Sequence, residues 1–201
     1  MTSQLQDVLS YNQLDEALDG RPFRYYEQVD STNNIARDWQ MANPHIPSGT
    51  VVIANEQTGG RGRHARHWHT PAGQALALSI ILRPNIDANR LQRLTMLAGV
   101  AVAEVIREVL PADKTDDIGL KWPNDVMLNG RKLAGILNEA VWYGNDLQAV
   151  VMGIGLNVSV DFANTELEEI ATSLHAHIPE SMPRITLIPR ILEQLDRWES
   201  R

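Results

Sequence analysis

The residue types best suited to chemistry are gathered in one stretch, residues 56–68, which reads EQTGGRGRHARHW. Three glycines and the arginines Arg61, Arg63 and Arg66 fall within eight positions of this loop. Glycine lets backbone N–H groups turn toward a ligand in conformations that other residues avoid. The arginine fork of donors suits carboxylate and phosphate oxygens. The composition is therefore typical of an anion-binding loop, although a solvated basic loop has the same composition.

The setting of this arginine loop favours the ligand-site interpretation. The apolar run 50–54 precedes it and the apolar run 74–82 follows it, and both are predicted to be strands. A long connection between two core elements is usually functional or disordered. Trp68 ends the loop and either joins the core or stacks on a flat ligand. His64, His67 and His69 have no spacing typical of metal ligands, so we do not expect a metal site there.

Polar residues also precede a predicted helix near the N-terminus. Residues 24–29 favour a strand, and the next four, Asp30, Ser31, Thr32 and Asn33, open a helix of about ten residues. A helix needs one capping residue, so this run exceeds what capping requires. Plain capping remains one interpretation. The alternative is that the spare hydroxyl and amide groups face a polar ligand.

The second half of the chain is predicted to form a hairpin and a glycine-bearing strand. Asn-Gly at 129–130 is a typical two-residue turn between strands 125–128 and 132–140, and a further strand covers 147–157. Alternate glycines in the sequence GIGLN leave one strand face bare, so a flat group can lie on the backbone. Long helices are predicted over 91–110 and 185–198. A lone lysine such as Lys121 or Lys132 is most often simply solvated.

Composition narrows the class of protein. The chain has 201 residues, is 43% hydrophobic, carries a net charge of −7 and contains no cysteine. We expect one domain over 1–201, with 1–20 as a short N-terminal extension. The acidic balance argues against DNA binding, and the absence of cysteine excludes disulfides and thiolate chemistry. No signal peptide and no membrane-length apolar run is present, so we expect a cytoplasmic protein with no membrane contact.

Four separated motifs agree in order and spacing with one family. GRGRHARHW, KWPNDV, RKLAGIL-N-E and GIGLNV resemble the biotin–protein ligases, also called biotin–[acetyl-CoA-carboxylase] ligases, over about residues 30–174. The resemblance implies an α+β fold in which a mixed β-sheet is flanked by helices, of the class II aminoacyl-tRNA synthetase or biotin synthetase-like type. It implies that biotin and ATP form biotinyl-5′-AMP. The biotinyl group then passes to one lysine of a biotin carboxyl carrier protein or domain.

The resemblance also implies roles for individual residues. Arg63 and Lys132 are the catalytic candidates. A biotin carboxylate and an α-phosphate are both anions and repel each other, so cations must neutralise their charges before they can react. Arg61 is a further cation that can do so. Mg²⁺ is implied at the pyrophosphate, with its ligands unknown. The biotin candidates are Ser31, Thr32, Asn33, Gln57, Gly60, Arg61, Gly135 and Gly153. The nucleotide candidates are Arg63, Arg66, Trp68, Asn124, Asp125 and Asn157, with Trp68 as the adenine stack.

The chain departs from the usual family pattern at Ala65 and at its C-terminal end, and it differs from the repressor members of the family at its N-terminal end. Ala65 replaces a usual glycine of the loop and would cost about 1 kcal/mol if that position needs a positive φ. Residues 1–20 offer no room for an N-terminal DNA-binding domain. The chain also stops where family members commonly continue into an SH3-like domain. The resemblance leaves a homodimer open.

Rival functions remain on the sequence alone. A lipoate–protein ligase or lipoyl transferase shares the fold and the adenylate chemistry, although KWPND and the double Gly-Arg motif argue against it. A non-catalytic biotin or nucleotide sensor would have no need of Arg63 and Lys132. A phosphate-binding regulator of nucleic acid is disfavoured by the net charge.

Overall fold

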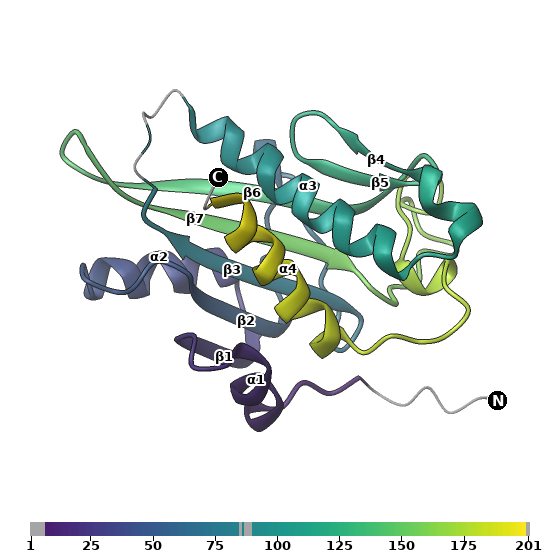
Figure 1. Cartoon of the computed structure of the whole chain (residues 1–201), viewed down its shortest axis with the longest axis horizontal. Helices are drawn as coiled ribbons and strands as arrows, with labels where there is room; N and C mark the ends of the chain where they lie inside the picture. Colours follow the sequence, from purple (N-terminus) through teal and green to yellow (C-terminus); the bar gives the residue numbers. More distant parts are fainter. Residues whose placement is uncertain (1–6, 85, 87–89, 200–201) are drawn as a thin grey trace.

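One seven-stranded mixed sheet organises the chain in the computed structural model, which describes residues 7–84, 86 and 90–199 (Figure 1). The strand order is β1-β2-β3-β7-β6-β5-β4. β1 and β2 are parallel, whereas all other neighbouring strands are antiparallel. The strands are β1 Phe23–Val29, β2 Thr50–Gln57, β3 Ala75–Leu82, β4 Ile118–Lys121, β5 Asp125–Leu128, β6 Arg131–Tyr143 and β7 Asp146–Asn157.

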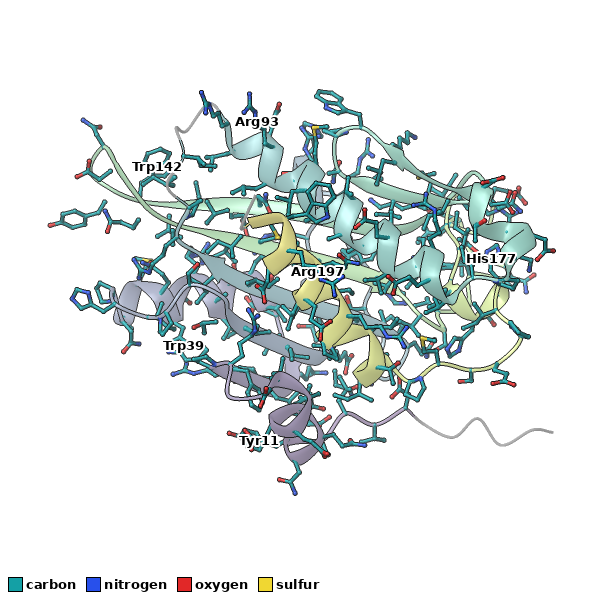
Figure 2. The ribbon with its side chains drawn as sticks, viewed as in Figure 1. Tyr11, Trp39, Arg93, Trp142, His177 and Arg197 are labelled. Carbon is teal, nitrogen blue, oxygen red and sulfur yellow. The ribbon has the colours of Figure 1, made fainter. Side chains whose placement is uncertain are left out.

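Helices cover both faces of this sheet, as Figure 1 shows. The long helices α3 and α4 pack together over one face, where the larger apolar cluster lies. α2 packs on the other face, over a smaller cluster that includes Ala36, Val52 and Val151. Trp39 of α2 lies against Arg24 of β1, whose guanidinium carbon is 4.0 Å from the ring centroid (Figure 2). The helices are α1 Tyr11–Leu18, α2 Thr32–Ala42, α3 Leu91–Val109 and α4 Arg184–Glu199.

Local sequence accounts for most of these elements. All eight residues of β3 are buried, because its neighbours β2 and β7 enclose it and helices cover both faces. Asn129 and Gly130 have φ of 49° and 73°, as the predicted two-residue hairpin turn requires. β2 continues to Gln57, so the arginine loop begins at residue 58 rather than 56. The short strand β4 is not among the strands predicted from the sequence.

The N-terminal segment is part of the packed structure. Leu14 and Leu18 of α1 are buried in the larger core cluster, and α1 packs on α4. The fully buried Arg184 begins α4 and pairs with Asp7, with 3.1 Å between Nε and Oδ2. Arg184 also donates to the carbonyl of Ala75 over 3.0 Å. Residues 7–18 therefore contribute to the core, where the sequence suggested a mere extension. Of the helices described, none is long and apolar enough to cross a membrane.

Candidate active site

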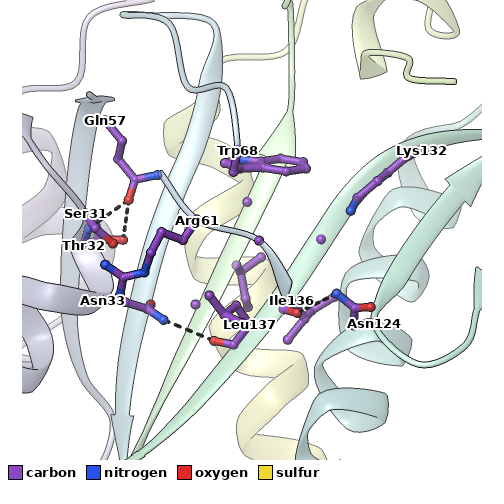
Figure 3. A pocket seen from close by; sticks show the side chains of 15 residues that line it. Ser31, Thr32, Asn33, Gln57, Arg61, Trp68, Asn124, Lys132, Ile136 and Leu137 are labelled. Carbon is purple, nitrogen blue, oxygen red and sulfur yellow. Dashed lines mark hydrogen bonds between the residues drawn. The ribbon is translucent and has the colours of Figure 1, made fainter. Parts of the chain in front are cut away.

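Two adjoining hollows lie where the arginine loop passes over β6 and β7, and Figure 3 shows the residues that line the first of them. The first hollow collects most of the candidate biotin residues. The second hollow is lined by most of the candidate nucleotide residues. Gly62, Trp68, Asn124 and Lys132 line both. The first hollow is lined by Ser31, Thr32, Asn33, Gln57, Arg61, Gly135 and Gly153, and the second by Arg63, Arg66, Asp125 and Asn157.

The start of α2 provides the polar end of the first hollow. Ser31 is the N-cap residue, but its side chain makes no capping bond and has no hydrogen-bond partner among the described residues. Thr32 donates to Oε1 of Gln57 from its backbone nitrogen over 2.8 Å and its hydroxyl lies 3.1 Å from the same oxygen. Gln57 in turn donates to the hydroxyl of Thr70 over 3.1 Å. Ser31, Thr32 and Asn33 of the predicted polar run therefore line the hollow, whereas Asp30 does not.

Ser79 supports this end of the hollow and was missed from sequence. It is fully buried in β3 and donates to Oδ1 of Asn33 over 2.6 Å, with the Thr32 hydroxyl 2.7 Å away. Its one signal was a serine inside the apolar run ALALSIIL. The Asn33 amide lies on Gly153, where an added Cβ would be 2.4 Å from Oδ1. The absence of a side chain at Gly153 therefore makes room for the side chain of Asn33.

The indole of Trp68 covers the remaining glycines. A Cβ on Gly155 would be 2.4 Å from Cε2 and Nε1 of Trp68, and one on Gly135 would be 3.4 Å from its Cζ3. Nε1 of Trp68 is buried and has no hydrogen-bond partner among the described residues. Nζ of Lys132 is 5.3 Å from the indole centroid. The flat group that lies on the glycine face is thus the protein's own tryptophan.

The arginine loop forms a small hairpin. Gly62 donates to the carbonyl of Arg66 over 2.7 Å, and the Trp68 nitrogen donates to the carbonyl of Gly60 over 2.9 Å. Neither Gly60 nor Gly62 has a positive φ, so the expected reason for the loop glycines was wrong. A Cβ on Gly60 would be 2.4 Å from the Trp68 carbonyl oxygen, so close approach of backbone excludes a side chain there. Gly60 lines neither hollow.

Ala65, which replaces a usual glycine of the family, does not require a positive φ. The left-handed residue of the loop is its neighbour His64, with φ 57° and ψ 38°. Ala65 is not among the residues with positive φ. It therefore does not carry the backbone cost that the sequence raised.

The three cations expected to meet the anions are not equivalent. Arg61 pairs with Glu139 at 3.1 Å and donates to Oδ1 of Asn34 over 2.8 Å. Lys132 pairs with Asp125 at 2.7 Å. The side chain of Arg63 makes no hydrogen bond or ion pair with any described residue and lines the second hollow. The sequence indicated the charges but not that two of them already have carboxylate partners.

Two amides assigned to the nucleotide side also bind the backbone. Nδ2 of Asn124 donates to the carbonyl of Ile136 over 3.0 Å. Nδ2 of the buried Asn157 donates to the carbonyl of Thr172 over 3.1 Å. These bonds fix the walls of the second hollow, and each side chain keeps its oxygen for another donor.

Comparison with known proteins agrees with this arrangement. The pattern of the biotin/lipoate A/B protein ligase family matches residues 25–157. The chain is 41% identical over 176 residues to the bifunctional ligase/repressor BirA of Bacillus spizizenii, covering 86% of this chain and 52% of that one. It is 39% identical over 132 residues to the biotin–[acetyl-CoA-carboxylase] ligase of Paracoccus denitrificans, covering 66% and 52%. The chain thus spans about half the length of these relatives.

Solved structures give the same result for the fold. The biotin protein ligase of Aquifex aeolicus in complex with biotin and ATP superposes with a TM-score of 0.73 at 28% identity, covering 89% of this chain and 70% of that one. The Leishmania major enzyme in complex with biotinyl-5-AMP gives 0.72 at 26% identity, covering 89% and 75%. The predicted mixed sheet flanked by helices, of the class II synthetase-like type, is confirmed. The sheet, the joined hollows and these matches together show that the chain belongs to the biotin/lipoate A/B protein ligase family.

Proposed function

We propose that this chain is an ATP-dependent biotin–protein ligase. The observation that carries the proposal is the pair of joined hollows with Lys132 and Trp68 at their shared boundary. One hollow ends in hydroxyl and amide groups that suit a cyclic urea. The other is lined by cations that suit a triphosphate, Lys121, Arg63 and Arg66 among them. The relatives named above are biotin ligases, which supports biotin over lipoate as the acid.

In the proposed reaction, biotin lies with its ureido end at Ser31, Thr32 and Gln57 and its carboxylate near Lys132. A carboxylate oxygen attacks the α-phosphorus of ATP, and the bond to the β-phosphate breaks to release pyrophosphate. The lysine amine of a carrier domain then attacks the biotinyl carbonyl, and AMP leaves as the amide forms. The chain contributes positioning and charge rather than a nucleophile, which agrees with the absence of cysteine.

The loop residues have proposed roles in the same reaction. Arg63 faces the nucleotide side without a carboxylate partner among the described residues, so its charge is free to meet phosphate oxygens. Trp68 closes the boundary between the hollows and stacks on the adenine. A closed loop excludes water from the mixed anhydride, which water would otherwise hydrolyse.

Mg²⁺ belongs to the proposal as a companion of ATP. Among the described residues, no group of three histidine or acidic side chains is arranged to bind a metal ion, and Asp125 is paired with Lys132. We therefore assign the ion no protein ligands. Mg²⁺ commonly binds through substrate phosphates and water with few protein ligands. No step described above depends on a protein-bound ion.

The test is incubation of the chain with biotin, ATP and Mg²⁺, followed by mass spectrometry for biotinyl-5′-AMP. A carrier domain added next should gain one biotinyl group on one lysine. Parallel reactions with lipoate separate the rival acid, and size-exclusion chromatography with light scattering tests the homodimer. Binding of biotin without any adenylate would favour the sensor, and lipoyl-AMP in place of biotinyl-AMP would favour the lipoate ligase.

A further inference from the structure

Glu139 joins the floor of the first hollow to the arginine loop. Its carboxylate accepts from Nη2 of Arg61 over 3.1 and 3.2 Å and from Nδ2 of Asn33 over 2.7 Å. Arg61 belongs to the loop, whereas Asn33 belongs to α2 and lies on Gly153. One side chain of β6 therefore holds two parts of the site that are far apart in sequence.

Because of the position of Arg61 in the loop, its contact with Glu139 affects both arms of the loop hairpin. Arg61 and His67 face each other as an isolated antiparallel bridge, flanked by the bonds from Gly62 to Arg66 and from Trp68 to Gly60. The two arms of the loop hairpin are therefore connected. Fixing the Arg61 side chain on β6 fixes the arm that carries Trp68 as well.

A second contact holds Arg61 from the α2 side. Nη1 of Arg61 donates to Oδ1 of Asn34, whose amide nitrogen is 2.5 Å from Oδ2 of Asp30. With the neutral Asn34 as its only partner, the guanidinium of Arg61 would remain an uncompensated charge at the edge of the first hollow. Glu139 supplies the compensating charge, and the pair is about one-third exposed on each side chain. Such a half-buried, multiply hydrogen-bonded pair is stronger than an exposed one.

We propose that Glu139 is a positioning residue that latches the arginine loop over the joined hollows through Arg61. It touches neither substrate in the proposed reaction and acts by holding Trp68 and Arg63 where the nucleotide is expected. The functional part of the inference rests on the proposed ligase activity. The latch itself is a property of the ligand-free chain and is testable without any activity.

Hydrogen exchange of the full chain without ligands measures the latch. The amides of Gly62 and Trp68 are bonded only while the hairpin is formed. Glu139→Ala should speed their exchange by about tenfold, because loop opening becomes easier. Arg61→Ala should do the same, and the double variant should exceed neither single variant by more than about twofold, since both remove one contact.

Glu169→Ala is the matched control. Glu169 also pairs with an arginine of β6, Arg131, at 3.7 Å, but this exposed pair makes no bond to a described residue of the loop. Loop exchange in Glu169→Ala should match the wild type. Equal loop exchange in Glu139→Ala and Glu169→Ala would overturn the latch, as would additive effects of Arg61→Ala and Glu139→Ala. If Glu139→Ala does not fold, Glu139→Gln decides in its place, with an expected increase of about threefold and with no increase overturning the latch.

The chemical consequence is measured separately. In wild type and Glu139→Ala, biotinyl-5′-AMP formed with biotin and ATP is followed as enzyme-bound and free fractions. Glu139→Ala should release the adenylate about tenfold faster and raise KM for ATP more than it lowers kcat. Unchanged release with faster loop exchange would refute the functional role and leave the latch. An inactive wild type would refute the proposed function, whereas the exchange result would stand by itself.

Discussion

The indole of Trp68 lies directly on the backbone of Gly155, so closely that a Cβ there would be 2.4 Å from its ring. Gly155 pairs with Gly135 of the neighbouring strand, and together they leave a bare patch under the ring. The two glycines therefore define where the tryptophan sits. Because Trp68 lines both hollows, its position also sets the boundary between them.

Gly155→Ala should displace this indole and weaken nucleotide binding. The added methyl group has no space beneath Trp68, so the ring must shift from its position. Loss of base stacking corresponds to roughly 1–3 kcal/mol of nucleotide affinity, measurable by calorimetric titration. Trp68→Ala should have a similar effect, and the double variant should add little. Gly119→Ala is the matched control, because nothing lies within 4 Å of a Cβ at that position of β4. Equal losses of biotin and nucleotide affinity would indicate that Trp68 serves only the packing of the core and does not stack on the base.

Lys132→Ala should retain biotin binding and lose most adenylate formation. A cation at the shared boundary acts chiefly where the two anions meet, so the rate should fall roughly 10²-fold, or about 3 kcal/mol. Pyrophosphate release measures this rate. Since the change also leaves Asp125 without its partner, the double variant with Asp125→Ala separates the two effects. Arg131→Ala, at the neighbouring and exposed position of β6, is the control. Near wild-type pyrophosphate release in Lys132→Ala would exclude the catalytic role.

Arg63→Gly should form biotinyl-AMP but release it early. Among the described residues, Arg63 has no carboxylate partner, unlike Arg61, so its charge-assisted contacts are free for the intermediate. Removing ~2–3 kcal/mol of binding raises the off-rate by roughly one to two decades. Free adenylate would then acylate lysines of bystander proteins, which blotting of added serum albumin for biotin detects. Strong albumin labelling by the wild type would show that the loop does not seal. Unchanged labelling by an active Arg63→Gly would exclude retention by Arg63.

His177 should make the stability of the fold depend on pH. Burial and the nearby Lys114 lower the pKa of His177 below its usual 6.5, and its Nε2 is 2.8 Å from the Thr172 hydroxyl. A depressed pKa means that the folded state disfavours the proton. The stabilisation is therefore complete above about pH 6.5 and is lost as the pH falls through the folded-state pKa. Between pH 7 and pH 5, the free energy of unfolding measured with urea should fall less for His177→Gln than for wild type. His45→Gln, at an exposed position, is the control, and identical slopes for wild type and His177→Gln would contradict the assignment.

Local patterns were sufficient for most of the elements that carry the site. The helical spacing of apolar residues over 91–110 and the Asn-Gly turn at 129–130 have local causes, so both were predicted correctly. Of the two interpretations of the polar run at the start of α2, plain capping by Ser31 is excluded, because its side chain makes no capping bond. β4 was missed because four residues at a sheet edge give little periodic signal.

The sequence by itself determined the family, the order of most strands and helices along the chain, and many of the residue types that line the two hollows. Only the tertiary structure decided which of these residues are already engaged. Arg61 and Glu139 are 78 positions apart, and Ser79 and Asn33 are 46 apart. Their contacts depend on strand order and register across the sheet, which local propensity does not encode. For the same reason, the bare face of β7 was visible in the sequence, but the tryptophan that covers it was not.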